Sequence, residues 1–115
     1  MRKGGIMKRF TFIILISFCF FSCDFGTSFE YRITGTVPTA QVSYMHERGW
    51  ITTPSVVNIP HSIAFFSKQR QQLYINAKNL TASGELTVEI FIDGVLVDSD
   101  TSFDPYGIVN ASYNH

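Results

Sequence analysis

The two cysteines of this chain, Cys19 and Cys23, lie within one short segment, residues 16–26, and no cysteine follows them. A disulfide between them would join two residues of an apolar stretch and leave the rest of the chain without one. A closed zinc site needs four donors, and no histidine lies nearby. A nucleophilic thiol needs a base and an electropositive setting, whereas Asp24 follows Cys23. These uses of a thiol are disfavoured, which leaves lipid attachment.

The residues before Cys23 have the anatomy of an export signal. Four basic residues lie within residues 1–9, and an almost unbroken apolar run follows over residues 10–21. A charged start and a short apolar run are typical of a signal peptide, whereas a membrane-spanning helix needs about 20 apolar residues. The sequence FFSC, residues 20–23, resembles a bacterial lipobox, in which a small residue precedes a cysteine that is acylated.

We therefore predict a lipoprotein signal peptide over residues 1–22, and a lipidated cysteine with a flexible tether over residues 23–28. Acyl chains on Cys23 would anchor the protein, because stable anchoring needs more than one chain and lipoproteins of this type carry several. Two alternatives stay open: a plain secretory peptide with an incidental cysteine, and a retained hydrophobic anchor.

The charge of the chain changes sign after the leader. The first 23 residues contain four basic and no acidic residues, whereas the rest contains five basic and nine acidic residues, a net charge of −4. Nucleic-acid binding depends on lysine and arginine neutralising phosphates, and here the basic residues are few and scattered. Nucleic acid is therefore not an expected partner.

From residue 29 onward, apolar and polar residues alternate, and turn-forming residues interrupt the pattern at short intervals. A period of two is typical of half-buried β-strands. In the first such run Phe29, Tyr31 and Ile33 share one face. The same pattern predicts extended structure over residues 40–45, 50–53, 63–66, 73–78 and 106–113.

The clearest predicted element is a hairpin over residues 86–97, in which two alternating runs flank Asp93-Gly94. An Asp-Gly pair supplies the positive φ angles of a type I′ turn. No apolar stripe of helical period follows the leader, so we predict no helix there. About seven short strands predict an all-β fold, an immunoglobulin-like antiparallel β-sandwich over residues 29–115. We expect much of its core to come from Trp50, Phe65, Tyr74 and Phe91.

The sequence of this predicted sandwich resembles the MmpS-type transport accessory proteins and small bacterial lipoproteins of similar pattern. The resemblance covers nearly all of residues 29–113 and is carried by the runs YRITG, VSY, LYINAKN, VEIFIDGVLV and YGI. It implies an immunoglobulin-like sandwich that lies outside a membrane and is associated with a large efflux transporter.

The sequence offers no constellation typical of catalysis. The three histidines, His46, His61 and His115, are isolated from one another and are interpreted as surface residues. We predict no catalytic residue and no cofactor, because an enzyme needs a nucleophile or an acid–base pair held in a cleft.

One acidic segment carries a metal hypothesis. Oxygen donors recur at every second position of residues 98–104, as they can in calcium sites, so Asp98, Asp100 and Asp104 form a candidate calcium site. An EF-hand loop would have glycine at Phe103 and glutamate at Val109. The alternative is a solvated acidic loop.

Together these features predict a noncatalytic, lipid-anchored protein of the bacterial cell envelope. Its partners would be the membrane, through Cys23, and an envelope or membrane protein such as a transporter, for which it would serve as an accessory or interaction module. No small-molecule substrate is indicated. The alternative is a surface-exposed module that binds glycan or host protein through Trp50, Tyr106 and Tyr113.

Overall fold

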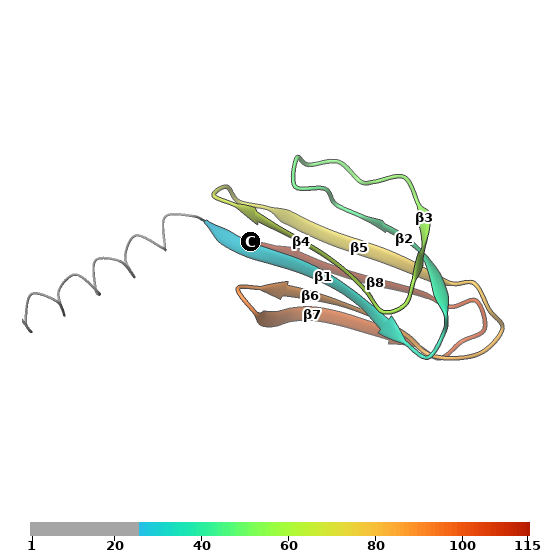
Figure 1. Ribbon diagram of the computed structural model, residues 1–115. Helices are drawn as coiled ribbons and strands as arrows, with labels where there is room; N and C mark the ends of the chain where they lie inside the picture. The colour runs from blue at the N-terminus through green and yellow to red at the C-terminus, as the bar shows by residue number, and fades with distance from the viewer. Residues whose placement is uncertain (1–25) are drawn as a thin grey trace, which may run out of the picture.

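The computed structural model describes residues 26–115, which form two four-stranded antiparallel sheets packed as a sandwich (Figure 1). One sheet has the order β4-β1-β6-β7 and the other β3-β2-β5-β8. The strands are β1 (Thr27–Gly35), β2 (Thr39–Tyr44), β3 (Ser55–Asn58), β4 (His61–Ser67), β5 (Gln72–Asn79), β6 (Leu86–Ile92), β7 (Val95–Ser102) and β8 (Ile108–Asn114).

The predicted all-β sandwich is confirmed, and its arrangement is compatible with an immunoglobulin-like fold. Residues 26–115 contain no helix, and so none that is long and apolar enough to cross a membrane. The predicted signal peptide and Cys23 lie outside the described residues. Strand β1 begins at Thr27, so the last two residues of the predicted tether belong to the sandwich.

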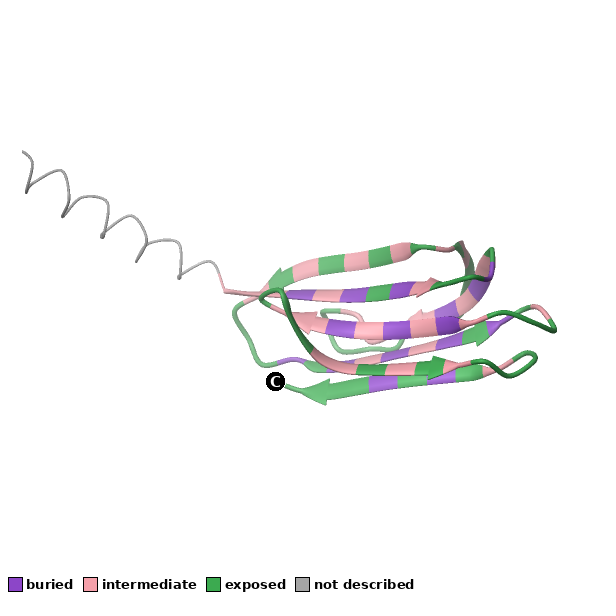
Figure 2. Cartoon of the chain, turned by 90° about the horizontal axis from the view of Figure 1, so that it is seen from below, coloured by how far each residue is buried: buried purple, intermediate pink, exposed green. Residues whose placement is uncertain are grey.

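The core lies between the sheets and is built from the inward residues of alternating strands. Figure 2 shows buried residues alternating with more exposed ones along the strands. The period-two prediction is confirmed in β1, where Phe29, Tyr31 and Ile33 are fully buried. The other buried apolar residues are Val37, Ala40, Val42, Leu73, Ile75, Ala77, Leu86, Val88, Ile90, Val109 and Ala111.

The aromatic core that we expected from the sequence is wrong for Trp50, Tyr74 and Phe91, whereas Phe65 packs against the buried core and stacks on Phe29. Trp50 is 51% exposed and lies in the β2–β3 loop, where the predicted strand over residues 50–53 is reduced to an isolated bridge between Ile51 and Met45. Phe65, Tyr74 and Phe91 are only partly buried. Phe65 is on edge strand β4, and Phe91 points outward beneath the Arg32 guanidinium, 4.1 Å from the ring centroid. The aromatic rings at the centre are those of Phe29 and Tyr31.

The predicted hairpin is present as β6 and β7. Asp93 and Gly94 have φ angles of 50° and 80°, as a type I′ turn requires. The turn is joined to the start of β1, because the Asp93 N–H donates to the Ser28 carbonyl and the Ser28 N–H donates to the Asp93 carboxylate. The pairing register of β6 with β7 shifts between Ile90 and Phe91, where a bulge interrupts the ladder of hydrogen bonds.

Candidate functional site

The two ends of the sandwich differ in what they present. The N-terminal end holds Gly26, the Asp93-Gly94 turn, the β4–β5 loop and His115, whose N–H donates to the Gln71 carbonyl. The opposite end, called here the far end, holds the β1–β2, β5–β6 and β7–β8 loops. A chain anchored upstream of β1 would therefore direct the far end away from its anchor.

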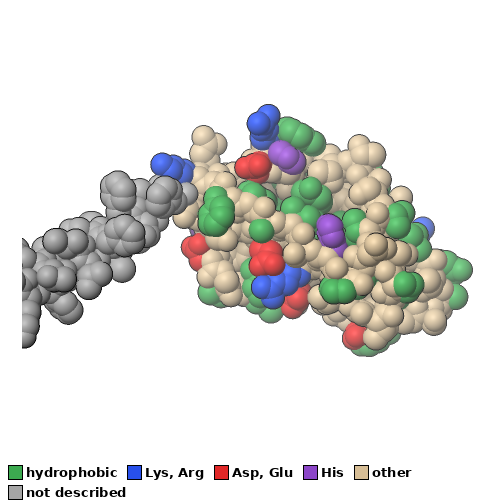
Figure 3. Space-filling model, viewed as in Figure 1, with side chains coloured by type: hydrophobic (Ala, Val, Ile, Leu, Met, Phe, Trp, Pro, Cys, Tyr) green, Lys and Arg blue, Asp and Glu red, His purple; other side chains and the backbone are tan. Residues whose placement is uncertain are grey.

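Four large apolar side chains are exposed at the far end. They are called here the far-end cluster, and their exposed fractions run from 37% to 71%: Leu80, Phe103, Tyr106 and Ile108. Figure 3 shows hydrophobic side chains at this end of the surface. Exposed apolar residues that occur singly are ordinary, but several at one end of a domain, here on two adjoining loops and the start of β8, are typical of a contact surface.

Backbone hydrogen bonds hold the two loops of the far-end cluster together. The Tyr106 N–H donates to the Thr81 carbonyl at 2.9 Å, and the Asn79 N–H donates to the Gly107 carbonyl at 2.9 Å. Within the β7–β8 loop the Gly107 N–H donates to the Asp104 carbonyl at 3.0 Å. These bonds fix the backbone at Tyr106 and Gly107.

Asn79 is the buried residue that shapes the β5–β6 loop. Its side chain is 1% exposed. The carboxamide oxygen accepts from the N–H and hydroxyl of Thr81, both at 2.8 Å, and the amide group donates to the Ser83 carbonyl at 3.1 Å. From the sequence we did not predict this role for Asn79. The available signal was an asparagine two residues before a threonine, a pattern typical of an Asx turn.

Tyr106 has an unusual backbone conformation. Its φ angle is +53°, in the left-handed region that non-glycine residues other than asparagine, aspartate and histidine seldom occupy. Such a conformation costs on the order of 1 to 3 kcal/mol and persists where the surroundings impose it. An exposed tyrosine held in this way is a candidate contact residue, because asparagine or glycine would fit the turn with less strain.

The three aromatic residues proposed for glycan or host contact do not form one surface. Tyr113 pairs with Leu73 at the start of β5, whereas Tyr106 lies beyond the end of β5. Trp50 is in the β2–β3 loop, stacked on His46 with ring centroids 4.3 Å apart and planes 8° apart. The far end therefore receives only Tyr106 of these residues.

The candidate calcium residues are placed differently from the solvated loop we considered. Asp98 and Asp100 are in strand β7, and only Asp104 is in a loop. The Asp98 carboxylate accepts from the Ser112 N–H at 2.9 Å, and the Asp100 carboxylate accepts from the Asn110 N–H at 3.0 Å. These two carboxylates thus join the edge strands of opposite sheets. In residues 26–115 no group of three or more acidic, histidine or cysteine side chains converges as a metal site would require.

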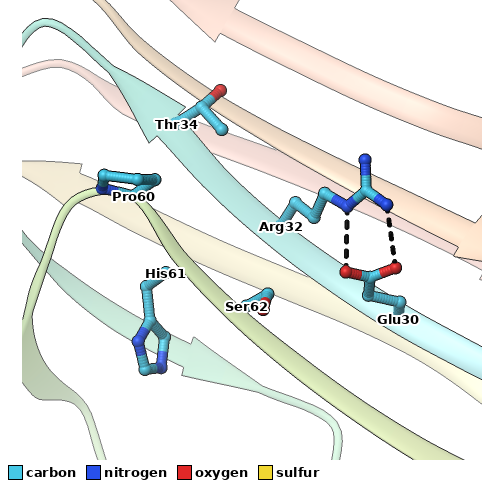
Figure 4. A pocket seen from close by; sticks show the side chains of 6 residues that line it. All are labelled: Glu30, Arg32, Thr34, Pro60, His61 and Ser62. Atoms are coloured by element: carbon cyan, nitrogen blue, oxygen red, sulfur yellow. Dashed lines mark hydrogen bonds and ion pairs between the residues drawn. The ribbon is translucent and has the colours of Figure 1, made fainter.

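A shallow hollow lies on the outer face of β1 and β4. It is lined by Glu30, Arg32, Thr34, Pro60, His61 and Ser62 (Figure 4). The Arg32 guanidinium donates two hydrogen bonds to the Glu30 carboxylate, at 2.9 and 3.1 Å, which raises the pKa of Arg32 above its ordinary value. Because the same guanidinium lies over the Phe91 ring, one wall of the hollow is held in place.

The other two histidines lie apart from this hollow and from each other. His46 accepts a hydrogen bond from the Arg48 N–H at its Nδ1 atom, and His115 meets Phe29 edge-on with ring centroids 5.4 Å apart.

A scan against protein-family models finds no match to this chain, and a search of curated proteins finds none.

Proposed function

We propose that this protein is a noncatalytic, lipid-anchored interaction module of the bacterial cell envelope, which presents its far end to a membrane or envelope protein. The observation that carries the proposal is the far-end cluster, which lies at the end of the sandwich opposite the start of β1. The resemblance of residues 29–113 to the MmpS-type accessory proteins favours a transporter as the partner.

The chemistry of the far end suits a protein contact. The cluster combines two aromatic and two aliphatic side chains, of which Ile108 begins β8 and the others lie on two loops whose backbones are hydrogen-bonded to each other. Preorganised loops lose little conformational freedom on binding, and exposed aromatic residues contribute strongly to protein interfaces. The charged residues of these loops, Glu85 and Asp104, would lie at the rim of such a contact.

The anchor is tested by replacing Cys23 with serine. We expect Cys23→Ser to move the protein from the membrane fraction to the soluble fraction in detergent phase partitioning, because acyl chains supply the binding free energy. The far-UV circular dichroism of the variant should keep its β-sheet form. Cys19→Ser is the matched control and should stay with the membrane. Unchanged partitioning of Cys23→Ser would reject lipidation.

The contact is tested at Tyr106. We expect Tyr106→Asn to keep or raise stability by up to about 1 kcal/mol, because asparagine tolerates a positive φ angle. The same variant should lose most of a partner that chemical crosslinking and pull-down recover from native membranes with the wild-type chain. Tyr113→Asn, at an exposed tyrosine near the N-terminal end, is the control and should retain the partner. Equal recovery by both variants would place the contact elsewhere.

A second candidate function, binding of a neutral glycan, is favoured by the outer face of the β3-β2-β5-β8 sheet. There Asn110 accepts from the Tyr74 hydroxyl at 3.2 Å and from the Asn76 amide at 2.6 Å. Amide, hydroxyl and tyrosine side chains are suited to the hydroxyl groups of sugars. Retention of the protein on a neutral polysaccharide column, unaffected by Tyr106→Asn, would support this candidate over the first.

A further inference from the structure

We propose that two copies of this chain pair edge to edge through β4, antiparallel about a two-fold axis at Ala64, so that the β4-β1-β6-β7 sheet continues from one copy into the other. This pairing concerns a surface distinct from the far-end cluster. The pairing places the N-terminal end of each copy beside the far end of the other, so two anchored copies would pair with their strands along the membrane surface.

The β4 edge lacks the features with which proteins block sheet edges. Of the four edge strands, β3 has only four residues, while β7 and β8 are joined through the carboxylates of Asp98 and Asp100. Strand β4 has seven residues, HSIAFFS, without a proline, lysine or acidic residue. Among the described strands it has extended backbone contact with β1 alone. A long, uncharged, apolar edge is a template for strand pairing.

The absence of Lys, Arg, Asp and Glu from β4 means that a second copy meets no like charge at this edge. When Ala64 faces Ala64, Ile63 comes opposite Phe65 and no charged residue of β4 meets another. The nearest charge in sequence, Lys68, comes opposite Pro60. Pairing of β7 with its own copy would instead bring the Asp98 and Asp100 carboxylates of two chains together, which is unfavourable.

The outer face of β4 also offers a projection and a matching hollow. Phe66 is 68% exposed, and in this register the Phe66 ring of one copy comes opposite Ser62 of the other. Ser62 lies at the edge of the hollow that Arg32 and Pro60 also line (Figure 4). The ring can therefore pack against the hydrocarbon parts of Arg32 and Pro60. The two-fold axis repeats the contact, so each copy contributes one Phe66 and one hollow, as an isologous interface requires.

The pairing is tested on the full chain by sedimentation equilibrium in density-matched detergent at micromolar concentrations. We expect the wild-type chain to be a dimer, and Ala64→Lys to raise its dissociation constant at least about tenfold, because two ammonium groups would face each other on the axis. The matched control, Ser99→Lys on exposed β7, should remain dimeric. A monomeric wild-type chain, or a dimer that Ala64→Lys leaves unchanged, would overturn the proposal.

A crosslinking measurement covers the case in which Ala64→Lys fails to fold. In a Cys19→Ser, Cys23→Ser background, Ala64→Cys places two thiols opposite each other, and mild oxidation should give a disulfide-linked dimer. Ser99→Cys in the same background should give none. If circular dichroism shows that the Ala64→Cys variant is folded but no disulfide forms, the pairing is refuted. That result would also hold if a strand from another protein, rather than a second copy, occupied this edge.

Discussion

Replacing Gly35 with alanine is expected to lower the free energy of unfolding by about 3 kcal/mol or more. Gly35 ends β1 opposite Leu86 and has a φ angle of +147°, which side chains disfavour. A Cβ atom there would also collide with the carbonyl oxygen of Glu85. The collision is with backbone, so it can be relieved only by moving β1 away from the start of β6. Urea unfolding followed by circular dichroism measures the loss.

Gly49→Ala is the matched control for this prediction. Gly49 also has a positive φ angle, +97°, but a Cβ atom there would have no neighbour within 4 Å. We expect a loss of only about 1 kcal/mol, the part that belongs to the backbone angle. The difference between the two variants isolates the collision. Equal losses would mean that β1 and β6 separate at Gly35 without a penalty.

The stability of the domain is expected to fall by about 2 kcal/mol between about pH 10 and pH 12, because of Tyr31. Burial raises the pKa of Tyr31 from 10.0 to about 12, partly opposed by the hydrogen bond from the Tyr74 N–H. A pKa that is raised in the folded state contributes stability below the unfolded pKa, and that stability is lost as pH rises through the folded pKa. Urea unfolding at a series of alkaline pH values tests this.

Tyr31→Phe separates the titration of this hydroxyl from general alkaline damage. The Tyr31 hydroxyl donates to the Met45 carbonyl at 2.9 Å, so its removal should cost about 1 to 2 kcal/mol at neutral pH. The variant should then lose less stability than the wild type as pH rises from 10 to 12. Tyr113→Phe, at an exposed tyrosine, should keep the wild-type loss. An identical pH dependence in Tyr31→Phe would exclude Tyr31 as its source.

Which side chains of a strand point inward was predictable from the sequence, but whether the strand is central or at the edge of its sheet was not. Alternation placed Phe29, Tyr31 and Ile33 inward because side chains of a strand point to opposite faces. The same alternation does not say whether a strand is central or at an edge. Phe65 is inward but lies on edge strand β4, so it packs against the core while remaining only partly buried.

The far-end cluster and the aspartates of β7 depend on contacts between distant parts of the chain. Tyr106 reaches Thr81 only because β8 pairs with β5, and Asp98 reaches Ser112 only because β7 and β8 lie at adjoining edges of different sheets. Local spacing therefore suggested a metal loop at Asp98, where the fold uses the carboxylate between sheets. The Asp-Gly hairpin was predictable because its whole signal is local.

The position of β1 bears on when the chain can fold during synthesis. The first described strand lies at the centre of its sheet, between β4 and β6, so it acquires both neighbours only after residue 92 has been made. The last strand, β8, supplies Val109 and Ala111 to the core. Long-range pairing of this kind is slow to form. Neither sheet can therefore be completed before the strands that follow β5 have been synthesised, and the core between the sheets closes only when β8 is present.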